Sequence, residues 1–137
     1  MSDSPTFFVL DSFALLAYLG GETGEGRTKE ILHEAVLKEN HAFMSLINLG
    51  EVVYISERER GLAKAQEVLA VVEQLPFEIL PVNRQTVLAA AHIKASYPIA
   101  YADAFAVVAA QEQNGTLVTG DPEFESVKDI VQIEWVG

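Results

Sequence analysis

The sequence contains no cysteine among its 137 residues. This absence excludes disulfide bonds, cysteine-ligated zinc sites and thiol catalysis, and it suits a cytoplasmic protein. Positive charge is also scarce, because nine Lys and Arg residues stand against 20 Asp and Glu residues, which gives a net charge of −11. So acidic a chain is unlike a protein that coats nucleic acid. It remains compatible with a nuclease, since a cation bound in an acidic pocket reverses the local electric field.

Long uninterrupted apolar runs are missing as well. The apolar stretch over residues 7–19 is broken by Asp11 and has no basic flank. It is too short to span a membrane, which takes about 20 apolar residues, and it lacks the basic region of a secretory signal. We therefore expect a strand followed by a helix, in a protein that does not associate with membranes.

The length and composition are those of one globular domain. Half of the residues are apolar and 21% are charged, so residues 1–137 are expected to form a single domain. Short apolar segments predict strands over residues 6–10, 41–45, 77–80, 116–119 and 133–136. Segments of helical character cover residues 12–19, 27–39, 46–60, 62–75, 83–96 and 101–113. Strands separated by helices form parallel sheets with helices on both faces, so the sequence predicts an α/β fold.

Four acidic residues lie where predicted strands or helices begin or end. Asp11 directly follows the first strand, and Asp121 follows the fourth strand after a single glycine. Both should therefore lie at the carboxyl edge of the sheet, where α/β proteins bind their ligands. Asp103 lies in the first turn of its helix and Glu51 in the second turn of another. Carboxylates that meet at one edge repel one another unless a cation lies between them, so the pattern predicts a metal site.

The ligand chemistry indicates which metal would bind there. Carboxylate oxygens are hard ligands that suit Mg²⁺ or Mn²⁺. Either cation can activate a water molecule and neutralise a phosphodiester in its transition state. Four neighbouring polar residues are further candidates. Asn48 shares a helix face with Glu51 and could orient a carboxylate or a water molecule. Ser12 and Thr119 adjoin the site, although a cap or a strand hydroxyl explains each better, and Glu123 is a less favoured outer carboxylate.

Each of the four acids also has an ordinary structural explanation. Asp11 is well placed to cap a helix, and Asp103 is favoured by the helix dipole. Asp121 suits a turn, and Glu51 suits a solvated helix face. The combination favours a metal site, because all four residues map to one predicted edge of the sheet.

Three segments of the chain carry a resemblance to a known family. They are VLDSFALLAYL around Asp11, INLGEVVY around Glu51, and AYADAFAVVAAQEQNGTLVTGDPEF around Asp103 and Asp121. The chain resembles the PIN-domain family, and within it the VapC-type toxins of bacterial toxin–antitoxin pairs, essentially from end to end. The four acids match the acidic quartet of that family, and Thr119 matches a frequent hydroxyl position.

The resemblance implies a fold, an activity and partners. The expected fold is a three-layer α/β/α domain with a central parallel sheet. The expected activity is that of a Mg²⁺- or Mn²⁺-dependent endoribonuclease, in which the quartet would provide both the catalytic residues and the metal ligands. The expected partners are an RNA substrate, a cognate antitoxin and a second copy of the chain in a homodimer.

Other functions stay open at this point. The alternatives within the fold are an RNA-processing nuclease outside a toxin–antitoxin pair and a catalytically silent binding module. A phosphatase of the haloacid-dehalogenase type would need a second Asp where this chain has Phe13. A two-component receiver domain would need a lysine after the last strand, and the sequence offers none there.

Two surface features bear on possible partners. Candidates for a subunit or antitoxin interface are apolar helical residues, namely Leu46, Leu49, Val53 and the helix over residues 62–75. Three cations cluster near Gly61, namely Arg58, Arg60 and Lys64. A solvated charged surface is the expected explanation of that cluster, with contact to RNA phosphates or a partner left open.

Overall fold

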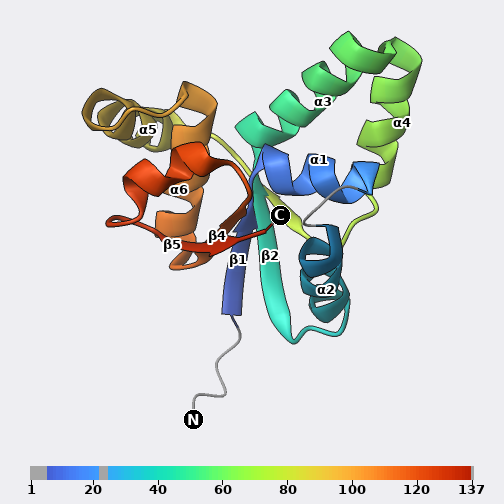
Figure 1. Cartoon of the computed structure of the whole chain (residues 1–137), viewed down its shortest axis with the longest axis horizontal. Coiled ribbons are helices and arrows are strands. Elements are labelled where there is room, and N and C mark those ends of the chain that lie inside the picture. Colours follow the sequence, from blue (N-terminus) through green and yellow to red (C-terminus); the bar gives the residue numbers. More distant parts are fainter. Residues whose placement is uncertain (1–5, 22–24, 137) are drawn as a thin grey trace.

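The computed structural model describes residues 6–21 and 25–136 of the chain. Figure 1 shows a central sheet with helices on both sides. The strands are β1 (Thr6–Leu10), β2 (Asn40–Ser45), β3 (Glu78–Leu80), β4 (Thr116–Thr119) and β5 (Gln132–Trp135). The helices are α1 (Ser12–Gly20), α2 (Glu25–Val36), α3 (Leu46–Arg60), α4 (Leu62–Val72), α5 (Arg84–Ser96), α6 (Tyr101–Gln113) and the 3₁₀ helix η1 (Pro122–Val127).

The strands pair in parallel in the order β3-β2-β1-β4-β5. From β1 the chain first adds β2 and β3 on one side, and it then adds β4 and β5 on the other side. The carboxyl ends of β1 and β4 therefore flank the point where the strand order reverses. Open α/β sheets bind their ligands at such a point, so the topology alone marks this crevice as the candidate site.

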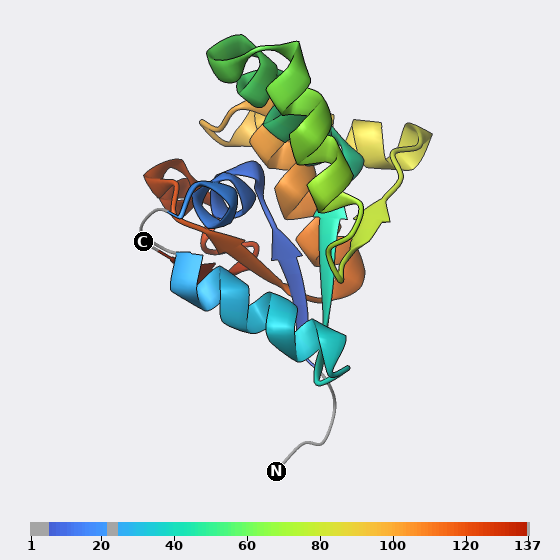
Figure 2. The same cartoon turned by 90° about the vertical axis from the view of Figure 1, so that its right-hand side faces the viewer.

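Alternate residues of β1 face two different helical layers. Val9 packs in a core cluster with residues of α5 and α6, whereas Phe8 and Leu10 pack in a cluster with residues of α1 to α4. Figures 1 and 2 show α5 and α6 on one side of the sheet and α1 to α4 on the other. The predicted three-layer α/β/α fold with a central parallel sheet is confirmed.

Helix α6 is the most deeply buried helix, because all of its residues from Asp103 to Ala110 are buried. A helix that is apolar on every side has to lie in the interior. It ends at Asn114, which adopts φ of 55°, and Gly115 follows. A Cβ on Gly115 would lie 2.7 Å from the carbonyl oxygen of Phe7, so glycine lets β4 start directly beside β1. Within the described residues no helix, α6 included, has the length and hydropathy needed to cross a membrane.

Several predicted boundaries differ from the structure by one to three residues. The helix predicted over residues 27–39 is α2, which ends about one turn early because Lys38 adopts φ of 61°. The helix predicted over residues 62–75 is α4, which also ends about one turn early, in tight turns that precede β3. The strand predicted over residues 133–136 is β5, displaced by one residue.

The 3₁₀ helix η1 matches no sequence prediction. Its buried residues Phe124 and Val127 are three positions apart, which is the repeat of a 3₁₀ helix. Asp121 caps η1 by accepting a hydrogen bond from the main-chain N–H of Glu123 at 2.9 Å. So short a helix has too few apolar residues to show a helical pattern in the sequence. Its position nevertheless determines where the side chains of Asp121 and Glu123 lie.

Candidate metal centre

Asp11 is held at the junction of β1 and α1 by two hydrogen bonds. One carboxylate oxygen caps α1 by accepting from the N–H of Ala14 at 2.8 Å, and the other accepts from the Thr119 hydroxyl at 2.5 Å. The side chain is almost fully buried. Burial raises the pKa of Asp11 to about 7, although both hydrogen bonds lower it. Asp11 is therefore a helix cap, and it is also a buried carboxylate whose charge is only partly compensated.

Thr119 joins the two carboxyl ends that flank the crevice. It is the last residue of β4 and is fully buried. Its hydroxyl donates to Asp11 and accepts from the main-chain N–H of Asp121 at 3.0 Å. One side chain thus fixes the distance between the first and the fourth acid of the quartet.

Asp103 lies in the first turn of α6 and is 7% exposed. Burial, and after it repulsion from other carboxylates, together raise its pKa to about 7. In decreasing order, the repelling residues are Glu123, Asp121, Glu51 and Asp11. All four sequence-predicted acids and Glu123 are therefore close enough to act on one another electrostatically.

Three of these acids form a tight group. One oxygen from each of Asp103, Asp121 and Glu123 lies within 4.8 Å of the other two. Oxygens on opposite sides of a Mg²⁺ ion, each at ~2.1 Å, lie roughly 4.2 Å apart, so small side-chain rotations bring this group onto one cation. The all-oxygen donor set and the uncompensated charge both fit Mg²⁺ or Mn²⁺.

Glu51 approaches the same edge from α3. The Ser12 hydroxyl, at the start of α1, donates a hydrogen bond to Glu51 Oε1. After burial, repulsion from Glu51 contributes to the raised pKa of both Asp11 and Asp103. Glu51 lies outside the tight group of three carboxylates, and it is only half-buried.

The comparison with known families agrees with this geometry. The family model described as PIN domain matches residues 8–130. The chain belongs to the PIN domain family. The matched range contains all five carboxylates of the crevice, and the family predicted from the sequence is confirmed.

Solved structures of similar fold include toxin–antitoxin complexes. The PIN domain superimposes on VapBC2 from Rickettsia felis, solved with a promoter DNA fragment, with a TM-score of 0.75 and 18% identity, over 96% of this chain and 100% of that chain. DNA-bound VapBC from Salmonella typhimurium gives a TM-score of 0.71 and 18% identity, over 94% and 97% of the two chains. At such identities the likeness establishes the fold alone. No curated protein matches the sequence.

A third structure is similar over most of its length. It is VapC20 from Mycobacterium tuberculosis, described as a toxin that cleaves the sarcin–ricin loop. Its TM-score is 0.68 at 17% identity, over 89% of this chain and 95% of that chain. The fold of this PIN domain is therefore similar to that found in VapC20 and in the VapBC complexes.

The structure also places the weaker candidates of the sequence. Ser12 and Thr119 hold two of the acids, as described above, and Glu123 joins the tight group. Asn48 is fully buried in the first turn of α3, and its amide nitrogen donates to the carbonyl oxygen of Ala102 at 3.2 Å. The signal that could have favoured Glu123 is the Asp-Pro-Glu sequence after β4, because a capping Asp followed by proline marks the start of a helix, whose first turn then holds Glu123.

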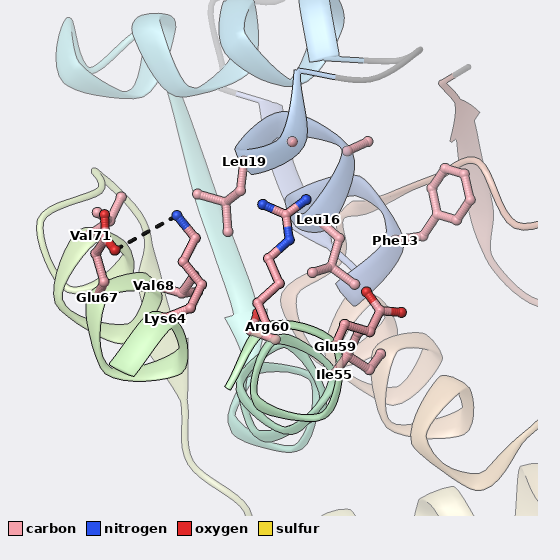
Figure 3. Close-up of a pocket in the computed structure, with 13 residues that line it drawn as sticks. Phe13, Leu16, Leu19, Ile55, Glu59, Arg60, Lys64, Glu67, Val68 and Val71 are labelled. Atoms are coloured by element: carbon pink, nitrogen blue, oxygen red, sulfur yellow. Dashed lines mark ion pairs between the residues drawn. The ribbon is translucent and has the colours of Figure 1, made fainter. Parts of the chain in front are cut away.

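A separate groove lies between α1, α3 and α4, as Figure 3 shows, and it has a volume of about 470 Å³. Its walls are mainly apolar, with Leu16 and Leu19 on one side and Val68 on another. Arg60 and Lys64 extend into it, and Lys64 pairs with Glu67 at 3.7 Å. The apolar wall continues to Phe13, which lies beside the metal centre in sequence and in space.

The cationic cluster near Gly61 therefore divides into two parts. Arg58 lies over the ring of Tyr54, 5.6 Å from its centroid, and approaches Glu59 at 3.9 Å, which is the solvated arrangement expected from the sequence. Arg60 and Lys64 instead line the groove. Only these two residues are placed to contact a partner bound there.

Proposed function

We propose that this PIN domain is a Mg²⁺- or Mn²⁺-dependent endoribonuclease that acts in the cytoplasm as the toxin of a type II toxin–antitoxin pair. The observation that carries the proposal is the convergence of five carboxylates at the crevice between β1 and β4. Two of them, Asp11 and Asp103, are buried with their pKa raised to about 7. Such a concentration of negative charge is unfavourable for an empty scaffold and favourable for a divalent cation.

The proposed catalytic and metal-binding residues are Asp11, Glu51, Asp103 and Asp121, with Glu123 added because its oxygen belongs to the tight group. Bound among them, the cation would activate a water molecule and offset the charge of an RNA phosphodiester. The residues themselves supply the geometry. Thr119 fixes the acids that follow β1 and β4, and Ser12 directs Glu51 toward the crevice. Glu51 is the half-buried acid, and it is placed to orient a water molecule toward the substrate.

The test is cleavage of RNA by the purified chain at limiting Mn²⁺, compared with Asp103→Asn. The substitution removes a charged ligand while nearly keeping its shape, and we expect a loss of at least ~100-fold, since changes around the ligands alone cost ~10–100-fold. The matched control is Asp129→Asn, an exposed acid outside the crevice, which should keep wild-type activity. Wild-type cleavage by folded Asp103→Asn would reject the assignment.

The wild-type chain also tests the alternative functions. RNA cleavage by a chain whose expression does not inhibit growth would indicate an RNA-processing enzyme. No cleavage at all by the wild-type chain would indicate a binding module.

We propose the groove between α1, α3 and α4 as the docking surface for the antitoxin. An amphipathic segment fits it, with apolar side chains against Leu16, Leu19 and Val68 and an acidic side chain opposite Arg60. The groove reaches Phe13, so an occupant would extend to the edge of the metal centre. Several similar structures are complexes of a toxin with its antitoxin, which supports a partner of this kind.

Co-purification of the tagged chain with the product of the neighbouring small reading frame tests this docking surface. Arg60→Glu should weaken the complex by reversing the charge in the groove, and Leu16→Asp should weaken it by placing a charge against apolar side chains. Arg84→Glu makes the same charge change at the exposed start of α5, in the opposite helical layer, and should leave the complex intact. Equal binding by all three variants would move the partner to another surface.

A further inference from the structure

Asn48 connects the two helices that carry Glu51 and Asp103. It lies in the first turn of α3, directly after β2 ends, and its side chain is 0% exposed. Its amide nitrogen donates to the carbonyl oxygen of Ala102, the residue before Asp103. Glu51 follows Asn48 by one helical turn, so the two share a face of α3. A single buried side chain therefore sets the start of α6 against the start of α3.

The side-chain oxygen of Asn48 makes no hydrogen bond to the described residues. This oxygen, Oδ1, is buried. Buried polar atoms in folded proteins are hydrogen-bonded as a rule, and each exception calls for an explanation. The Ala102 carbonyl accepts from the nitrogen, which fixes the amide orientation and leaves the oxygen as the free group.

Asn40 offers an internal comparison. It is also a buried asparagine, its nitrogen donates to a helix carbonyl, that of Ile31, at 3.1 Å, and its oxygen also lacks a partner. It begins β2, whereas Asn48 follows the end of β2. The Asn40 nitrogen donates in addition to the Glu34 carboxylate at 3.1 Å. The two residues therefore share burial, a bond to a helix carbonyl and an unpartnered oxygen, but they lie at opposite ends of the same strand.

We infer that Asn48 is a positioning residue of the metal centre: by donating to the Ala102 carbonyl, its nitrogen holds the α6 turn that carries Asp103 against the α3 turn that precedes Glu51. The inference rests on the proposed function and goes beyond the acidic residues. The amide is neutral, so it adds no repulsion to the crowded carboxylates. It acts on the cation through the position of Asp103, and it is not a direct ligand.

The experiment is a titration with Mn²⁺ in which the electron paramagnetic resonance signal of free Mn²⁺ reports binding. Asn48→Leu keeps the branched shape and the number of heavy atoms of the side chain and removes both polar groups, and Asn40→Leu makes the same change at the amino end of β2. Asn48→Ser is a second variant, in which the smaller side chain is too short to reach the Ala102 carbonyl. Circular dichroism establishes that each variant is folded. RNA cleavage is then measured as a function of Mn²⁺ concentration.

Asn48→Leu and Asn48→Ser should bind Mn²⁺ ~10–100-fold more weakly than wild type, as expected for residues that orient metal ligands. The Mn²⁺ concentration for half-maximal cleavage should rise by the same factor, and Asn40→Leu should change neither value. Wild-type Mn²⁺ affinity in the Asn48 variants, or equal weakening by Asn40→Leu, would overturn the inference while leaving the proposed function standing. A wild-type chain that neither binds Mn²⁺ nor cleaves RNA would overturn both.

Discussion

Asp11 and Asp103 are both buried carboxylates, but their surroundings differ. Burial raises the pKa of Asp11, while hydrogen bonds from Thr119 and Ala14 partly counter that effect. Burial also raises the pKa of Asp103, and there the other contributions are repulsions from neighbouring acids. Asp103 is therefore the residue whose charge depends most on a bound cation, and it is the most informative position to neutralise.

The raised pKa values predict how stability depends on pH when a chelator removes metal. The ordinary pKa of Asp is 3.8, and the folded-state pKa of both residues is about 7. Between pH 3.8 and about pH 7 the folded state therefore binds more protons than the unfolded state, so the free energy of unfolding falls as pH rises. We expect a lower melting temperature at pH 8 than at pH 5. Asp103→Asn should flatten this dependence, and Asp129→Asn should not. If the melting temperature depends on pH equally in wild type and Asp103→Asn, Asp103 does not titrate between these pH values.

The sequence predicted that Asp11, Glu51, Asp103 and Asp121 lie at one edge of the sheet, because each adjoins an apolar strand or helix, and the structure brings the four together. Their role as a metal site stays a proposal. The sequence pattern gave less weight to Glu123, whose position depends on the backbone of η1. It also left the role of Thr119 open, since a hydroxyl at a strand end gives no sign of which groups it bonds. These contacts join residues far apart in the chain, for example Thr119 and Asp11, and short sequence patterns do not record them.

At the scale of elements, the turn between β4 and η1 passes close to α1 at Gly120. A Cβ at Gly120 would lie 2.2 Å from the ring of Phe13 and 2.4 Å from the carbonyl oxygen of Val136. The side chain could rotate away, but the carbonyl belongs to the main chain and cannot move alone. Glycine is thus required for the turn that carries Asp121 to approach α1.

We predict that Gly120→Ala destabilises the protein by about 1–3 kcal/mol, as overpacked cores do, and lowers Mn²⁺ affinity by displacing Asp121. Gly50→Ala is the control, since Gly50 lies inside α3 with nothing within 4 Å of the added Cβ. That change should stabilise the protein by up to about 1 kcal/mol through helix propensity. Urea unfolding with and without Mn²⁺ measures both effects. An unchanged midpoint for Gly120→Ala would show that the turn can relax.

Most helices and strands could be predicted because each buries one or two of its faces, and this burial sets the spacing of its apolar residues in the sequence. The predicted helices over residues 46–60 and 101–113 match α3 and α6 in the structure. The missed ends have local causes: the positive φ of Lys38 stops α2, and tight turns stop α4. Neither cause produces a change in hydrophobic pattern, which is why the sequence extended both helices too far.

At the scale of the whole molecule, the order of the strands creates the site. Alternation of strands and helices predicts a parallel sheet, but it does not say which strands are neighbours. Pairing of β4 beside β1 brings Asp121 next to Asp11, although 109 intervening residues separate them (121 − 11 − 1). The single-domain prediction for residues 1–137 and the homodimer both stay predictions.

We expect a homodimer in solution because large apolar side chains are exposed on α3 and α4. Leu46 and Leu62 are 47% and 58% exposed, whereas Val68 and Val72 of the predicted interface helix belong to the core. Light scattering at tens of micromolar protein should give the mass of two chains. Leu46→Glu should lower the measured mass toward that of a single chain. Val36→Glu, which alters another exposed apolar residue, should leave the dimer intact. A wild-type monomer at that concentration would reject the prediction.

The central claim is that the carboxylates at the crevice exist to hold a divalent cation, and thermal melting tests it most directly. Wild type and Asp103→Asn are melted in chelator and in Mn²⁺. In chelator, Asp103→Asn should be the more stable protein, because one repelling charge is gone. Mn²⁺ at ~100 times its dissociation constant should stabilise wild type by ~2.7 kcal/mol and Asp103→Asn by far less. If Mn²⁺ stabilises both proteins equally, or stabilises neither, Asp103 is not part of a metal site.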